Sequence, residues 1–212
     1  GIPGAGRALV YAALSQALDR PLCIVTPGEA EATRFAGDLN ALGIPTAVFP
    51  ARDYVLRPIE GTAREYEYRR LSVLGDIVGG RLQAVCVPDE GLTQYTTPRA
   101  EFCNNTRTLH PGDTVPRTEL TALLYNAGYA RRAQVDGPGQ FSIRGDIVDL
   151  YAPDMKLPVR MEFWGDEIDT MHTFDLATQR REDPIEKIYV SPAREVLFGS
   201  PAEASDLLRA FI

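Results

Sequence analysis

The 212-residue sequence contains few of the residues that build disulfide frameworks or metal sites. It has three cysteines and two histidines. Cys23, Cys86 and Cys103 are odd in number and far apart, and they match neither a disulfide pattern nor zinc-ligand spacing. His110 and His172 form no H-x-x-x-H pair. The sequence therefore predicts reduced thiols, no metal site and no cofactor.

Long apolar runs and lysine are also scarce. No stretch approaches the ~20 apolar residues that cross a bilayer, and the N-terminus has no basic segment followed by a hydrophobic run. We therefore expect a cytoplasmic protein without a membrane partner. The net charge is −7 and, of the 22 basic residues, only Lys156 and Lys187 are lysine. An acidic chain without a lysine-rich stripe is not expected to bind nucleic acid tightly through its net field.

The first half of the chain alternates between the helical period and short apolar runs. This rhythm is typical of a parallel sheet whose strands are joined by helical crossovers. It predicts an α/β domain over residues 1–108. The expected helices are 8–18, 30–42 and 63–77, and the expected strands are 22–25, 46–49 and 82–87.

The second half is broken by glycine and proline into segments of strand length. A helix is expected at 117–126, followed by short strands that would pair in antiparallel fashion. We expect a smaller α+β domain over residues 109–197, and residues 198–212 would begin a further helical element that returns to the first domain. The expected strands are 131–135, 140–144, 147–151, 159–164 and 170–174.

The N-terminus resembles a phosphate-binding loop that has lost its working side chains. The pattern G-x-x-x-x-G-K-[ST] matches Gly1 and Gly6 in its glycine places, with Gly4 between them. A working loop needs a lysine for the outer phosphates and a hydroxyl for magnesium, and Arg7 and Ala8 occupy those places. The sequence thus predicts a degenerate P-loop NTPase-like domain without hydrolysis. An ordinary glycine-rich start before a helix remains the alternative.

A long ordered string of residues carries a specific family resemblance. The string comprises Gly128–Arg131, Gly139–Leu150, Pro158–Ile168, Phe174-Asp175, Thr178–Arg180 and Pro192–Glu195. It resembles the module shared by the bacterial transcription-repair coupling factors and the excision-repair helicase subunit UvrB. Residues 1–127 match more loosely, through Phe49–Asp53 and Glu67–Leu71.

Two departures favour the coupling factors over UvrB. UvrB keeps an intact phosphate loop, whereas Arg7 and Ala8 depart from that pattern here. UvrB also inserts a long aromatic-rich hairpin in its first domain, and residues 53–64 are too short for that hairpin. The resemblance implies a non-catalytic adaptor that recruits UvrA to stalled transcription complexes in nucleotide excision repair. It also implies a downstream ATP-dependent translocase that acts on RNA polymerase and DNA, and masking of the adaptor by other domains of the full-length protein.

The resemblance assigns UvrA binding to Arg144, Arg160 and Trp164, the last in a place commonly held by Phe. Period two along residues 159–164 puts Arg160, Glu162 and Trp164 on one face and Val159, Met161 and Phe163 on the core face. We expect Arg144 on a neighbouring strand. Two guanidiniums beside an exposed aromatic side chain have the composition of an interface hot spot.

Other interpretations of the same residues stay open at this point. Arg144 and Arg160 could pair with local acids such as Asp146 or Glu162, while Trp164 covers a sheet edge. The alternative function is that of a nucleotide-dependent enzyme. It would be either a nucleotide-binding fragment of a UvrB-type helicase that binds DNA directly, or an ATPase that uses Arg7 in an unconventional way.

Overall fold

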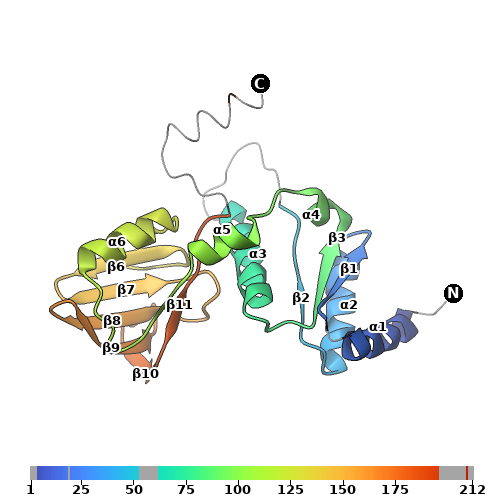
Figure 1. Ribbon diagram of the computed structural model, residues 1–212, viewed down its shortest axis with the longest axis horizontal. Coiled ribbons are helices and arrows are strands. Elements are labelled where there is room, and N and C mark those ends of the chain that lie inside the picture. The colour runs from blue at the N-terminus through green and yellow to red at the C-terminus, as the bar shows by residue number, and fades with distance from the viewer. Residues whose placement is uncertain (1–3, 19, 53–61, 196–208, 210–212) are drawn as a thin grey trace. The chain divides into compact units, whose positions relative to one another are not determined.

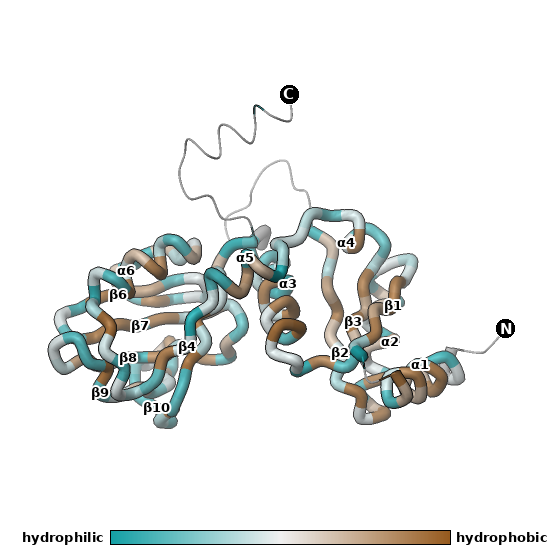
Figure 2. Tube along the Cα trace, in the orientation of Figure 1, coloured by the Kyte–Doolittle hydropathy of each residue, from teal (hydrophilic) through white to brown (hydrophobic). Residues whose placement is uncertain are grey.

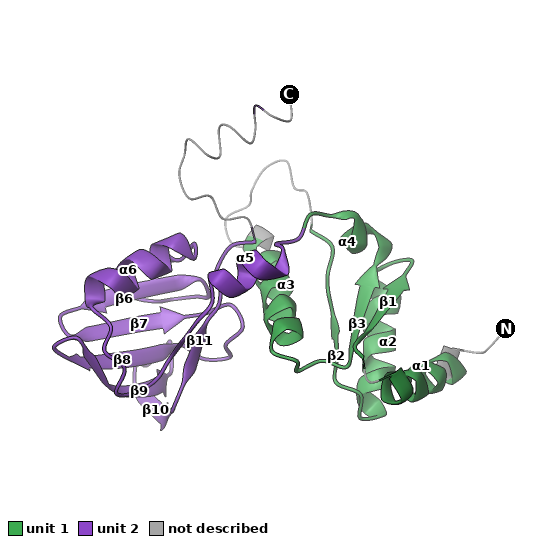
Figure 3. Cartoon of the chain, viewed as in Figure 1, with its two compact units in different colours: residues 1–95 green, residues 96–212 purple. Residues whose placement is uncertain are grey.

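The computed structural model describes residues 4–18, 20–52, 62–195 and 209, without the side chains of residues 4, 5, 62 and 63. The chain forms two compact units, Gly1–Tyr95 and Thr96–Ile212 (Figure 3). The boundary predicted from the sequence lies after residue 108. The units divide earlier because a strand at Arg107–Leu109 pairs with Ile188–Val190, which ties the preceding segment to the second unit. The helix expected beyond residue 198 falls almost wholly outside the described residues.

Unit 1 is an α/β unit, as predicted. Its three strands are parallel in the order β1-β3-β2, and the chain passes between them through helices (Figure 1). A short helix after β3 was not predicted. The elements are α1 (Gly4–Leu18), β1 (Leu22–Thr26), α2 (Glu29–Ala41), β2 (Thr46–Val48), α3 (Thr62–Val78), β3 (Ala84–Pro88) and α4 (Asp89–Thr93).

The sheet of unit 1 is buried on both faces at its central strand. On one face, Ala84 and Cys86 of β3 pack with Phe35 and Leu39 of α2. On the other, β3 packs against Val73 of α3. All five residues of β3 are buried, as expected for the middle strand of a parallel sheet covered by helices.

Among its described residues, unit 2 contains a six-stranded sheet in the order β10-β9-β8-β7-β6-β5, a two-stranded sheet of β4 and β11, and the helices α5 and α6. Strands β6, β7, β8, β9 and β10 pair in antiparallel fashion. The elements are α5 (Arg99–Asn104), β4 (Arg107–Leu109), α6 (Arg117–Asn126), β5 (Ala130–Arg131), β6 (Gln140–Arg144), β7 (Ile147–Tyr151), β8 (Val159–Trp164), β9 (Glu167–Phe174), β10 (Arg181–Pro184) and β11 (Ile188–Val190).

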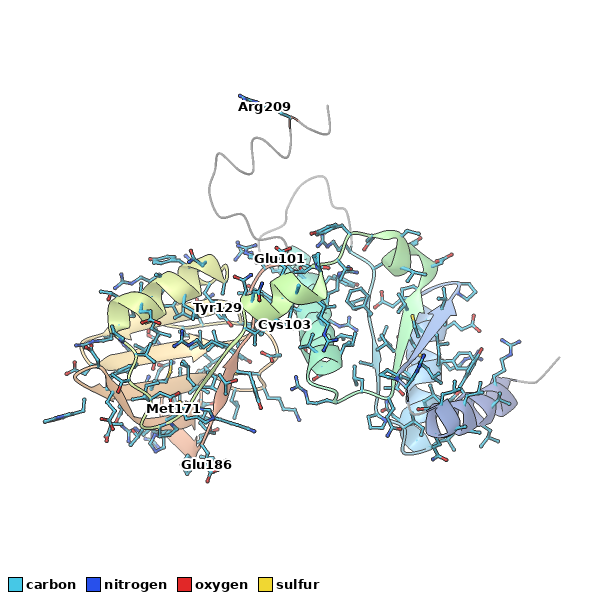
Figure 4. All side chains as sticks on the ribbon, viewed as in Figure 1. Glu101, Cys103, Tyr129, Met171, Glu186 and Arg209 are labelled. Carbon is cyan, nitrogen blue, oxygen red and sulfur yellow. The ribbon has the colours of Figure 1, made fainter. Side chains whose placement is uncertain are left out.

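One face of the large sheet forms the core of unit 2. Leu120 and Leu124 of α6 pack there with Phe141 of β6 and Met161 of β8. Met171 of β9 and Tyr129, both labelled in Figure 4, belong to the same core. The apolar stretches of the central strands are visible in Figure 2. We call this side the core face of the sheet and the opposite side its outer face.

The strands expected at 140–144, 147–151 and 159–164 have the predicted bounds, whereas β11 was not predicted. The strand expected at 131–135 is only Ala130–Arg131, and its antiparallel pairing was wrong because β5 runs parallel to β6. Strands β4 and β10 were not predicted, since each is a short run with polar residues. In the part of the chain that the structure describes, helices are too short or too polar to cross a membrane.

Candidate functional site

A polar row crosses the outer face of the large sheet. Ser142, Asp149, Arg160 and His172 lie directly opposite one another on β6, β7, β8 and β9. Their chain neighbours Phe141, Val148, Leu150, Val159, Met161 and Met171 belong to the core. Because successive side chains of a strand point to opposite faces, this row lies on the outer face.

Asp149 stands at the centre of the row and is fully buried. Its Oδ2 accepts a hydrogen bond from Nη2 of Arg144 at 2.6 Å. Arg160 donates to both carboxylate oxygens, from Nε to Oδ1 at 2.7 Å and from Nη2 to Oδ2 at 2.9 Å. The bidentate pair is the strong form of a charge-assisted hydrogen bond. One buried carboxylate therefore holds two guanidiniums.

Arg160 is enclosed by further contacts, and only 13% of its side chain is exposed. Its guanidinium lies 4.6 Å from the ring centre of Phe174, within the range of a cation–π interaction. Its Nη1 and Nη2 donate to the backbone and side-chain oxygens of Gln179, each at 3.3 Å. The hydrogen bond to Asp149 raises the pKa of Arg160, while burial acts in the opposite direction. Arg160 is a fixed cation.

Arg144 differs from Arg160 in its exposure. It is the last residue of β6, and 45% of its side chain is accessible to solvent. Asp149 carries one negative charge, and Arg144 and Arg160 carry two positive charges between them. The cluster therefore keeps one net positive charge, and Arg144 is the part of it that a partner can reach.

Trp164 ends β8 on the same face and exposes 84% of its surface. It lies opposite Glu167, beyond a register shift between Glu162 and Phe163. The turn after Arg144 reaches the same end of β8, because the Asp146 carbonyl accepts a hydrogen bond from the N–H of Phe163. An indole this exposed contributes little to the core and is available to a partner.

The structure confirms part of the predicted geometry and corrects another part. The alternation along β8 is as predicted. The placement of Arg144 and Arg160 on neighbouring strands was wrong, because β7 lies between β6 and β8. That strand supplies Asp149, which joins the two arginines from the middle.

The alternative in which both arginines pair with a local acid is confirmed, but the acid is Asp149 and not either of the two examples. Asp146 pairs with Arg117, and Glu162 pairs with Arg181. Asp149, Phe174 and Gln179 were not predicted as members of this cluster. A signal for Asp149 was available, since this acid stands between Val148 and Leu150 in an apolar strand. The assignment of partner binding to Arg144, Arg160 and Trp164 stays a prediction.

Two polar atoms of the row are buried without a hydrogen-bond partner in the described structure. They are Oγ of Ser142 and Nδ1 of His172. These residues flank Asp149 and Arg160 on their two sides. The strong hydrogen bonds of the row are thus concentrated on its central pair.

The N-terminal phosphate-loop prediction is not confirmed. Gly1 lies outside the described residues, and α1 begins at Gly4, so Gly4 and Gly6 are already helical. Ala8 is buried in the core of unit 1. Arg7 approaches Glu31 of α2 at 4.0 Å, with about half of its side chain exposed.

No group of three or more His, Cys, Asp or Glu side chains among the described residues is arranged to hold a metal ion.

Comparisons with known proteins match unit 2 to a domain family and nearly the whole chain to larger proteins. The family model of the UvrB interaction domain matches residues 108–196, which contain the polar row and Trp164. A transcription-repair-coupling factor of Mycobacterium tuberculosis is 34% identical over 212 residues, covering 95% of this chain. That of Myxococcus xanthus is 32% identical over 207 residues, and that of Bacillus subtilis 26% over 199 residues, each covering 93% of this chain.

The chain spans 17% of the length of each of these three relatives. The matches cover both units and confirm the resemblance drawn from the ordered residue string. Residues 108–196 belong to the UvrB interaction domain family, and nearly the whole chain is homologous to a segment of the transcription-repair-coupling factors.

Proposed function

We propose that this chain is a non-catalytic adaptor that binds UvrA through the outer face of unit 2. The observation that carries the proposal is the position of the exposed Trp164 at the same end of the sheet as Arg144. The Arg144 guanidinium is held there by the buried carboxylate of Asp149. Interface hot spots combine these features, with a rigid aromatic anchor and a directed arginine. The match of residues 108–196 to the UvrB interaction domain supports a binding role for unit 2.

The chemistry of the face indicates what it would recognise. Trp164 offers a large apolar surface that gains free energy when a pocket removes it from water. Arg144 offers a planar fork of N–H donors that matches a carboxylate. The surface on UvrA would therefore combine an apolar pocket with an acidic side chain beside it.

Capture of UvrA by the intact chain tests this proposal. We expect Arg144→Ala and Arg160→Ala variants that keep their melting temperature to recover less UvrA than the unmodified chain. Arg107→Ala is a matched control, since 46% of the Arg107 side chain is exposed and it also pairs with one acid, Glu119. Equal recovery by the unmodified chain and both outer-face variants would remove the arginines from the site.

We also propose that the segment turns over no nucleotide and needs no cofactor. Ala8 has no hydroxyl to hold magnesium, and its side chain is buried. Calorimetric titration with ATP and magnesium should give no binding in the micromolar range. Micromolar binding that disappears in Arg7→Ala would instead support the nucleotide-binding helicase fragment.

In the full-length protein, we propose that regions outside this segment supply the ATP-dependent translocase and the contacts to RNA polymerase and DNA. The adaptor face would be masked by other domains until UvrA is engaged. Comparing UvrA affinity of the full-length protein with that of this segment tests the masking. Tighter binding by the segment is the expected result, and equal affinity would contradict masking.

A further inference from the structure

The two arginines of the outer face are held in different ways. The Arg160 guanidinium contacts Asp149, Gln179 and Phe174 and is largely covered. Within the described part of the chain, Arg144 has one charged partner, Asp149, at 2.6 Å, and 45% of its side chain is exposed. A partner that settles on this face meets Arg144 far more readily than Arg160.

The two guanidiniums are coupled through one carboxylate oxygen. Oδ2 of Asp149 accepts from Nη2 of Arg144 and from Nη2 of Arg160. Oδ1 is held by Nε of Arg160, so Arg160 fixes the plane of the carboxylate. The direction in which Arg144 extends therefore depends on the Asp149–Arg160 pair beneath it.

We propose that Asp149, oriented by Arg160, is a positioning residue for Arg144. The buried carboxylate holds the Arg144 guanidinium in the orientation that meets an acidic group of UvrA, and Arg144 and Trp164 are the contacting side chains. The inference rests on the proposed function and divides the roles within the face: Arg144 and Trp164 contact UvrA, whereas Asp149 and Arg160 position Arg144. A side chain fixed before binding loses less conformational freedom when the complex forms.

The size of the effect follows from the freedom that the pair removes. Immobilising a flexible side chain at an interface costs about 0.5–1.5 kcal/mol, which corresponds to about two- to tenfold in Kd. Loss of the Asp149 carboxylate should weaken UvrA binding by that factor when Arg144 is present. When Arg144 is absent, the same change should have almost no effect on Kd.

A double-mutant cycle measured by calorimetry separates positioning from a general structural effect. Asp149→Asn is compared with the unmodified chain, and Asp149→Asn/Arg144→Ala with Arg144→Ala. The expected result is about two- to tenfold weaker binding in the first comparison and no resolved change in the second. Equal losses in both comparisons would overturn the proposal, as would no loss in the first.

Asp149→Asn leaves the buried Arg160 cation unpaired and can unfold the unit. Asp149→Asn/Arg160→Met avoids this, because it removes one charge of each sign, and replacing a buried ion pair with neutral groups is often tolerated. We expect the same pattern: weaker binding with Arg144 present and no change with Arg144→Ala. A loss that persists without Arg144 would show that Arg160 contacts UvrA itself and would refute the division of roles.

A measurement without UvrA keeps this test distinct from that of the proposed function. In nitrogen-15 spectra of the free chain, the Arg144 guanidinium should show restricted rotation of its terminal nitrogens, and Asp149→Asn should release it. Free rotation in the unmodified chain would overturn the positioning role, whatever the chain binds. Failure of the unmodified chain to bind UvrA would overturn the proposed function and, with it, the acidic partner assigned to Arg144.

Discussion

Replacing Trp164 with alanine separates binding from folding on the outer face of unit 2. The side chain exposes 84% of its surface, and a buried aromatic side chain removes about 200 Å² from water. At ~25 cal/mol per Å², complete burial against UvrA would contribute about 5 kcal/mol as an upper bound. Truncation of interface hot spots costs at least about 2 kcal/mol, and we expect Kd to rise by at least about 30-fold.

The stability of the chain should hardly change in this variant. Surface substitutions away from packed features usually alter the free energy of unfolding by less than about 0.5 kcal/mol. Isothermal titration with UvrA gives Kd, and urea denaturation gives the free energy of unfolding. Tyr189→Ala is the matched control, since Tyr189 is an exposed aromatic residue of the same unit and contacts Lys187. Unchanged affinity in Trp164→Ala, or an equal loss in Tyr189→Ala, would refute the reasoning.

Three further predictions concern the folded chain itself. Asp149→Asn should lower the free energy of unfolding by about 3 kcal/mol in urea denaturation, because removing one partner of a buried ion pair leaves an uncompensated charge. The control is Asp146→Asn, which removes an exposed acid paired with Arg117 and should cost less than about 1 kcal/mol. Equal losses in the two variants would contradict the central place of Asp149. Burial, with a smaller contribution from Cys23, raises the pKa of Cys86 to about 11. A thiol reagent at neutral pH should therefore modify the exposed Cys23 and Cys103 quickly and Cys86 only after denaturation. Rapid modification of Cys86 in the native chain would contradict its burial. Hydrogen bonds from the Thr178 backbone N–H and hydroxyl lower the pKa of Asp175. The stabilisation from this carboxylate should therefore be present above its ordinary pKa and be lost as the pH falls through the lowered pKa of the folded chain. Carbon-13 titration of the carboxyl resonance measures this pKa, and an ordinary or raised value would refute the prediction.

The sequence was informative where one face of an element is apolar. The alternation of Val159, Met161 and Phe163 with Arg160 and Trp164 predicted both the bounds of β8 and the face on which Trp164 lies. The crossovers of unit 1 were also predictable, because its strands and helices have different hydrophobic periods.

Strand order and side-chain pairing could not be predicted in this way. Periodicity assigns a residue to a face, but it does not say which strand lies beside it. The placement of β7 between Arg144 and Arg160 therefore became visible only in the structure, and so did the role of Asp149 as their common partner. Strand β10 was missed because all four of its residues are exposed, so it has no apolar period.

The helix at the N-terminus shows a further limit of motif spacing. Gly1 and Gly6 have the separation of a phosphate loop, but the described backbone is helical from Gly4 onward. Spacing alone does not fix the dihedral angles of the intervening residues, and a loop and a helix can contain the same letters.

The claim that the outer face of unit 2 docks UvrA can be tested most directly at Trp164, the one tryptophan of the chain. With 5-fluorotryptophan incorporated, the free chain should give a single fluorine-19 resonance that shifts between H₂O and D₂O because the indole is exposed. Saturation with unlabelled UvrA should move this resonance and abolish its solvent shift. A resonance that keeps its position and its solvent shift while UvrA is bound would contradict the account.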